Sequence, residues 1–142
     1  MQTNNDEQSS IIEYSEDISN AEAPLPLPVR TYPAVIRKVE ALTSQKGSRY
    51  AAVSLYISVD DYPADYPTEN APDGTTLVFR RIALDDTAAG RYRMRKFCET
   101  IGAPATKRVD LNDWLNLSCQ VAVKHEEFEG EKRAVAEKVL VA

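Results

Sequence analysis

Residues 49–59 read RYAAVSLYISV, and this stretch decides how the 142-residue chain folds. From residue 51 to residue 59 every second residue is apolar, and the residues between them are alanine, serine or tyrosine. This period of two is that of a β-strand, whose successive side chains point to opposite faces of a sheet. We therefore expect one face of the strand in a core and the other, which carries Tyr50 and Tyr56, on the outside.

Four further segments around this strand are typical of β-strands, and one is typical of a helix. The additional strands are predicted at Thr31–Leu42, Thr75–Leu84, Leu117–Glu126 and Arg133–Val141. The helix is predicted over Ala88–Ile101, between the third and fourth strands. Its apolar residues recur at spacings of three, one and three, namely Met94, Phe97, Cys98 and Ile101. The run Asp85–Thr87 can cap the start of this helix, and Gly102 can end it.

The register of the third strand has two solutions in the sequence. Either Leu77 and Phe79 face the core, or Val78 and Ile82 do. A slip of one residue exchanges the two faces of a strand, so the pattern alone leaves both arrangements open.

Two other segments depart from regular alternation. Two adjacent apolar residues, Val35 and Ile36, indicate a β-bulge in the first strand. The proline-containing segment Asp60–Gly74 is predicted to be a long loop. Its tyrosines either pin the loop to the sheet or serve a function of their own, since long ordered loops are often functional.

Five strands with a helix between the third and the fourth follow the order of an OB fold. Asp110 is expected to cap a short turn that inserts Trp114 into the barrel. We therefore predict an all-β fold with one helix, namely a five-stranded OB-fold Greek-key barrel. Such barrels commonly bind single-stranded nucleic acid on one face.

The chain is predicted to divide into an acidic tail, residues 1–24, and one domain, residues 25–142. The tail has six acidic residues and no Lys or Arg, so its charge is −6, and it is poor in aromatic residues. Such a composition is typical of disorder. The rest of the chain holds all 17 Lys and Arg against 16 acids, which gives a charge of +1.

Composition excludes several classes of protein. Hydrophobic residues are 43 % and charged residues 27 % of the chain, which is typical of a soluble globular domain. No apolar run is long enough to span a membrane, and the first ten residues lack the pattern of a signal peptide, so we expect a cytoplasmic protein. Cys98 and Cys119 are expected to be buried thiols. With one histidine, His125, and no CxxC, we expect no metal site and no cofactor.

Several segments in this order resemble a family of small phage and prophage OB-fold proteins that is associated with single-stranded DNA binding. The resemblance covers residues 25–141 and is carried by Leu25–Tyr32, Lys46-Gly47, Tyr50–Val59, Phe79-Arg80-Arg81, Phe97–Gly102 and Val109–Gly130. The family usually has Gly where this chain has Asn116, and Asn also tolerates the left-handed conformation of such a turn. The resemblance implies a part in phage DNA replication or recombination.

A nucleic-acid surface can be predicted from aromatic and basic residues that lie on or beside the expected binding face. Aromatic side chains stack on bases, and cations follow the phosphates. The candidates are Arg37, Lys38, Lys46, Arg49, Tyr50, Tyr56, Phe79, Arg80, Arg81, Lys124, Phe128, Lys132 and Arg133. Phe79 belongs to this set only if Val78 and Ile82 face the core. The cations of residues 91–96 are either a second contact area or a solvated face of the helix balanced by Asp85, Asp86 and Glu99, and the charge pattern favours the solvated face.

These observations favour sequence-independent binding of single-stranded DNA without catalysis. The adjacent acidic pairs of the chain lie in predicted turns and resemble solvated acids rather than a reactive cluster, so no enzyme is expected. The alternative is an OB-fold module that binds a replication or recombination protein through the tail, where Ile11–Tyr14 form a short apolar segment. The oligomeric state stays open, with a homodimer among the options.

Overall fold

The structure is a computed structural model that describes residues 10–142, and residues 1–9 of the predicted tail lie outside the described residues. It contains five strands and one α-helix. The strands are β1 (Thr31–Thr43), β2 (Arg49–Ile57), β3 (Thr75–Ala83), β4 (Ser118–Phe128) and β5 (Glu131–Leu140). The helix, α2, spans Ala88–Ile101 between β3 and β4. The mostly-β class with one helix, predicted from the sequence, is confirmed.

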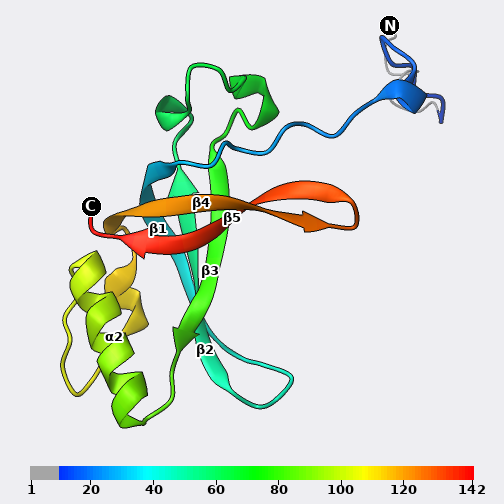
Figure 1. Cartoon of the computed structure of the whole chain (residues 1–142). Coiled ribbons are helices and arrows are strands. Elements are labelled where there is room, and N and C mark those ends of the chain that lie inside the picture. The colour runs from blue at the N-terminus through cyan, green and yellow to red at the C-terminus, as the bar shows by residue number, and fades with distance from the viewer. Residues whose placement is uncertain (1–9) are drawn as a thin grey trace, which may run out of the picture.

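The five strands form one antiparallel sheet in the order β3-β2-β1-β4-β5. The long β1 pairs with β4 over its first residues and with β2 over the rest. The β4–β5 hairpin therefore crosses in front of β1, β2 and β3, as Figure 1 shows. Cα atoms of β3 and β5 approach within 8 Å, but no hydrogen-bonded ladder joins these two strands within residues 10–142. The sheet is not closed.

Bulges shift the register of the sheet in β1 and in β3. In β1 the shift lies between Ile36 and Lys38, so the predicted bulge of this strand is confirmed. In β3 the pairing moves from Leu77 and Phe79, opposite core residues of β2, to Ile82, opposite Ala51. Neither of the two predicted registers holds along the whole strand, because Leu77 and Phe79 face the core in one part and Ile82 in the other. An extra residue in β3 turns residues 77, 79 and 82 all toward the core.

Trp114 fills the centre of the core, as the sequence predicts. It is 0 % exposed, and its ring centroid lies 5.1 Å from that of Phe97 on α2. The short 3₁₀ helix Leu111–Trp114 begins at Asp110, whose side chain accepts a hydrogen bond from the Asn112 N–H. Asn116 follows with φ 68°, in the left-handed region, so the turn tolerates asparagine as expected.

Helix α2 has the bounds that the sequence predicts. The Thr87 hydroxyl accepts a hydrogen bond from the Gly90 N–H and caps the first turn, while the helix ends at Gly102. Cys98 and Ile101 point into the core, and both cysteines of the chain are free and buried. None of the helices within residues 10–142 is long and apolar enough to cross a membrane.

The proline-rich entry to β1 is part of the folded domain. Leu27 is 2 % exposed and belongs to the core. The Tyr32 hydroxyl donates a hydrogen bond to the Pro28 carbonyl, and His125 Nε2 lies 2.8 Å from the Leu27 carbonyl oxygen. By contrast, residues 10–25 are exposed and contain only a 3₁₀ turn at Ile18–Asn20, far from the sheet in Figure 1.

The loop between β2 and β3 is ordered by its tyrosines. The rings of Tyr62 and Tyr66 meet edge to face at 5.1 Å, and Tyr66 is 8 % exposed. The Tyr62 hydroxyl donates to the Ala71 carbonyl and lies 2.7 Å from the Thr75 hydroxyl. These contacts favour the first of the two interpretations, that the tyrosines pin the loop.

Candidate nucleic-acid interface

The outer face of β1, β2 and β3 carries the aromatic and polar side chains predicted for binding. Val53 and Leu55 of β2 are fully buried, so Tyr50, Ser54 and Tyr56 lie on the opposite side of the strand. Directly paired residues of antiparallel strands share a face. Ser54 pairs with Lys38 on one side and Val78 on the other, so cationic and apolar side chains flank a small central residue.

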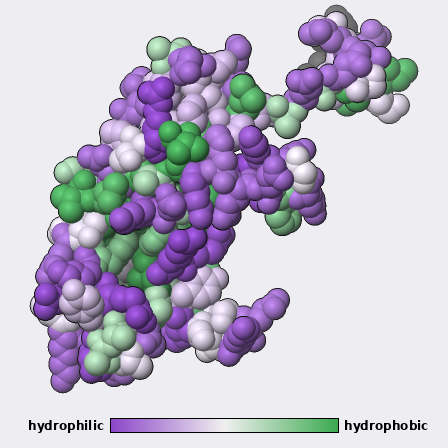
Figure 2. Space-filling view, in the orientation of Figure 1, coloured by the Kyte–Doolittle hydropathy of each residue, from purple (hydrophilic) through white to green (hydrophobic). Residues whose placement is uncertain are grey.

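The bulge of β3 brings two arginines to this face. Ala51 pairs with Ile82 and Val53 with Phe79, so Arg80 and Arg81 together lie opposite Ala52. Both arginines are exposed, and neither forms an ion pair within the part of the chain that the structure describes. Figure 2 shows a strongly hydrophilic strip over β3, below the β4–β5 hairpin.

The bulge of β1 directs Arg37 onto an aromatic ring. Its guanidinium carbon lies 4.1 Å from the centroid of Tyr56, a cation–π contact. The Tyr56 hydroxyl donates a hydrogen bond to the Asp73 carbonyl, and the ring end lies against the backbone of Gly74. Tyr56 is therefore a structural anchor of the β2–β3 loop as well as a candidate contact, and Arg37 covers part of its ring.

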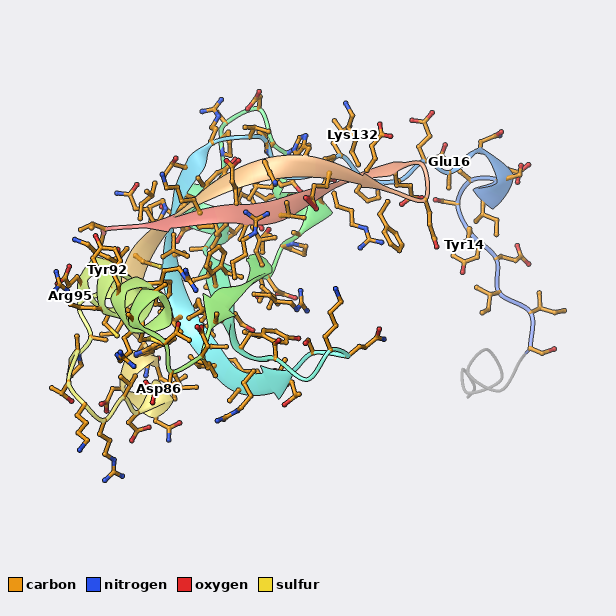
Figure 3. All side chains as sticks on the ribbon, turned by 60° about the horizontal axis from the view of Figure 1, so that its bottom comes forward. Tyr14, Glu16, Asp86, Tyr92, Arg95 and Lys132 are labelled. Atoms are coloured by element: carbon orange, nitrogen blue, oxygen red, sulfur yellow. The ribbon has the colours of Figure 1, made fainter. Side chains whose placement is uncertain are left out.

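The tip of the β4–β5 hairpin presents a second cation–aromatic pair. Phe128 is 51 % exposed, and the guanidinium carbon of Arg133 lies 3.9 Å from its centroid. Lys132, labelled in Figure 3, lies beside them on the same hairpin. Lys124 is nearer the base of the hairpin and forms an ion pair with Glu126 at 3.5 Å.

The β1–β2 turn supplies two more of the predicted cations. Lys46 and Arg49 are exposed, and Arg49 directly precedes Tyr50 on β2. The β1–β2 turn and the β4–β5 hairpin project on the same side of the molecule in Figures 1 and 3. The β1–β2 turn is basic, whereas the end of the hairpin combines Lys132 and Arg133 with four glutamates, Glu126, Glu127, Glu129 and Glu131.

Phe79 does not point to this outer face. It pairs with Val53 on the core side of the sheet and packs against the core, with its ring parallel to that of Phe97 within 6° at 6.3 Å. Phe79 was predicted to face outward only if Val78 and Ile82 faced the core. Because Phe79 itself faces the core, it is not part of this outer surface. Phe97, assigned from the sequence to the core stripe of the helix, is its partner. No sequence signal joins these two rings, because their contact depends on how α2 packs on β3.

The cations of α2 are each paired with an acid. Arg91 lies 2.6 Å from Asp86, Arg93 lies 3.8 Å from Asp85, and Arg95 and Lys96 share Glu99. All these side chains are at least 40 % exposed, so the pairs contribute little to stability. This arrangement agrees with the interpretation of a solvated helix face.

Neither metal ligands among the described residues nor a match to a family model or curated protein identifies the surface. Within residues 10–142 no group of three or more His, Cys, Asp or Glu residues could hold a metal ion. No protein-family model matches the chain, and no curated protein matches it.

Proposed function

We propose that the protein binds single-stranded DNA without sequence specificity and without catalysis. The observation that carries the proposal is the outer face of β1–β2–β3, where Arg37 at the β1 bulge lies over Tyr56, and Arg80 and Arg81 lie at the β3 bulge, beside the basic β1–β2 turn. Aromatic faces and backbone-following cations are the two elements of sequence-tolerant single-strand recognition. Several residues share the binding, since stacking and charge contacts are distributed along the bound DNA strand.

The proposal includes the OB fold. The order β4-β1-β2-β3 is the spatial order of a Greek key, in which the fourth strand returns beside the first. An OB fold is a partly open five-stranded barrel, and the approach of β3 to β5 without a ladder is compatible with that description. In this fold the β2–β3 face and the turns after β1 and β4 are the usual binding site.

The biological setting is part of the same proposal. The resemblance to phage OB-fold proteins supports a part in phage DNA replication or recombination in the bacterial cytoplasm. The motif from Val109 to Gly130 supports it most, because its cap at Asp110, left-handed Asn116 and hairpin at Gly130 serve definite structural purposes.

The test is a fluorescence-anisotropy titration of a labelled single strand of about 30 nucleotides, a length that covers several OB-fold site sizes. Binding is expected to be tight at low salt and to weaken steeply as salt rises, because counterions are released. A duplex should compete poorly. Phe128→Ala should weaken binding about fivefold or more, which corresponds to the loss of one stacked base.

Tyr92→Ala is the matched control. Tyr92 is 56 % exposed and also contacts cations, but it lies on α2 with Arg95, away from the hairpin that carries Lys132 in Figure 3. It should change affinity less than twofold. Absence of binding at low salt would remove the proposal, and equal losses for Phe128→Ala and Tyr92→Ala would remove this assignment of the surface.

The second candidate is a protein-interaction module that acts through its N-terminal segment. Ile12, Tyr14 and Ile18 are 72 %, 65 % and 64 % exposed within an acidic sequence, so a partner protein can reach these apolar side chains. This alternative predicts negligible DNA affinity at moderate salt. It also predicts that a replication or recombination enzyme co-purifies with the full chain and is lost when residues 1–24 are deleted.

A further inference from the structure

A groove of about 220 Å³ lies between β3 and α2, beside the proposed interface, with which it shares Arg81. The rings of Phe79 and Phe97 line it together, parallel within 6°. Phe97 packs against the buried Trp114, with 5.1 Å between the ring centroids. The core of the domain therefore fixes the position of Phe97. Both rings are partly exposed and can therefore be reached by a ligand.

The rim of the groove is cationic. Arg81 of β3 and Arg93 and Lys96 of α2 belong to its lining, which includes no acidic residue. The two ion pairs of the α2 cations are long, at 3.8 Å for Arg93 and 3.7 Å for Lys96, and exposed to solvent. Such pairs are worth little, so a phosphate can compete for these cations.

We propose that this groove binds one nucleotide of the single strand, with the base against Phe79 and Phe97 and a phosphate at the cationic rim. The proposal rests on the proposed function and deepens it. The occupant follows from the lining, since two partly exposed aromatic rings beside three cations suit a base joined to a phosphate. Arg81 also adjoins Arg80, so the groove continues the hydrophilic strip on β3 around the edge of the sheet.

A carboxylate placed in the groove tests the proposal without touching the rings. Thr100 lines the groove, and its hydroxyl donates a hydrogen bond to the Lys96 carbonyl. Thr100→Glu should weaken binding of the 30-nucleotide strand about tenfold at low salt, because it repels phosphate and draws Lys96 away from it. Thr106→Glu is the matched control. Thr106 is an exposed threonine outside this groove, and its hydroxyl likewise donates to a nearby backbone carbonyl, that of Arg108.

A second measurement reports the contact directly. A strand that carries 5-iodouracil is irradiated in complex with the full chain, and the cross-linked peptides are identified by mass spectrometry. Cross-links are expected at Phe79 or Phe97 in the groove and at Phe128 on the proposed interface. Thr100→Glu should reduce those in the groove and leave the one at Phe128. A folded Thr100→Glu variant that binds like Thr106→Glu, together with no cross-link at Phe79 or Phe97 in the wild-type complex, would overturn the nucleotide groove alone. A wild-type protein that fails to bind at low salt would overturn the proposed function as well.

Discussion

Single side chains in this protein serve both packing and surface chemistry, and Tyr56 shows how closely the two are joined. Its ring contacts Arg37, its hydroxyl holds the Asp73 carbonyl, and its ring end touches Gly74. A cost measured for Tyr56→Ala would therefore mix loss of loop order with loss of binding. Phe128 has no comparable packing duty in the described chain and is the cleaner probe of the surface.

The contact of Gly74 with Tyr56 gives a prediction for stability. A Cβ at Gly74 would lie 2.5 Å from the Tyr56 ring and hydroxyl, and the residue has φ 92°. Gly130, at φ 83°, has nothing within 4 Å of such an atom. Gly130→Ala should cost about 1 kcal/mol for its positive φ alone, and Gly74→Ala roughly 1 kcal/mol or more beyond that. Denaturant unfolding measures both, and equal costs would show that the loop moves freely away from Tyr56.

Burial of a thiol predicts a dependence of stability on pH. Cys119 is 2 % exposed, and burial raises its pKa to about 11, above the ordinary value of about 8.5. The folded state thus holds the proton more tightly than the unfolded state. This contribution to stability is complete below about pH 8.5 and is lost as the pH rises toward about 11.

The measurement is the free energy of unfolding between pH 8 and pH 11 for wild type and Cys119→Ala. The wild type should lose more stability over this range, by roughly 3 kcal/mol, whatever the cost of the substitution at neutral pH. Burial also raises the pKa values of Tyr32 and Tyr66, but these residues are common to both proteins. Equal losses of stability with rising pH in wild type and Cys119→Ala would contradict the raised pKa of Cys119.

At the scale of elements, the boundaries of α2 depend on local chemistry. Thr87 accepts the Gly90 N–H, and its own hydroxyl donates to Asp85, which lowers the pKa of that carboxyl. Thr87→Ala should destabilise the domain by about 1 kcal/mol, because the first turn of the helix loses its cap. Thr87→Ser retains the hydroxyl and should cost less than half of that. Thermal unfolding compares the two variants, and equal losses would indicate that the cap contributes nothing.

The predicted and observed elements agree where local sequence patterns are strong. They differ where strand pairing or packing against other elements sets the boundaries and the register. α2 was predictable to the residue, since a cap, an apolar stripe and a terminating glycine coincide. β2 ends at Ile57, two residues before its predicted end, because Ser58 caps the next 3₁₀ turn. The course of β3 was not predictable, because its bulge is set by pairing with β2 and packing under α2.

At the scale of the molecule, the domain begins inside the proline-rich segment rather than at β1. Leu27 is buried in the core, and its carbonyl contacts His125 of β4, a residue distant in sequence. Residues 10–24, in contrast, are exposed. The sheet therefore does not depend on the described part of the acidic segment for its packing. The segment can influence DNA binding through its negative charge without changing the fold.

Truncation tests this division. Deletion of residues 1–23 should leave the unfolding midpoint within about 2 °C of the full chain, whereas Leu27→Ala should cost about 2–5 kcal/mol through the cavity it leaves. The same deletion removes six acids and should strengthen single-strand binding severalfold at low salt, with less effect at high salt. A fall in affinity on deletion would instead point to a direct contribution of the segment to binding.

The sequence alone determined the number and order of the strands, the helix with its ends, the Trp114 plug and the acidic character of the first residues. These features depend on side-chain periodicity, turn residues and capping groups, which act over a few neighbouring positions. Tertiary structure alone decided that Phe79 turns inward to meet Phe97, that Arg37 lies over Tyr56, and that the sheet stays open between β3 and β5. Each of these depends on strand register and on the packing of distant segments, and a one-residue bulge is enough to exchange the faces of a strand.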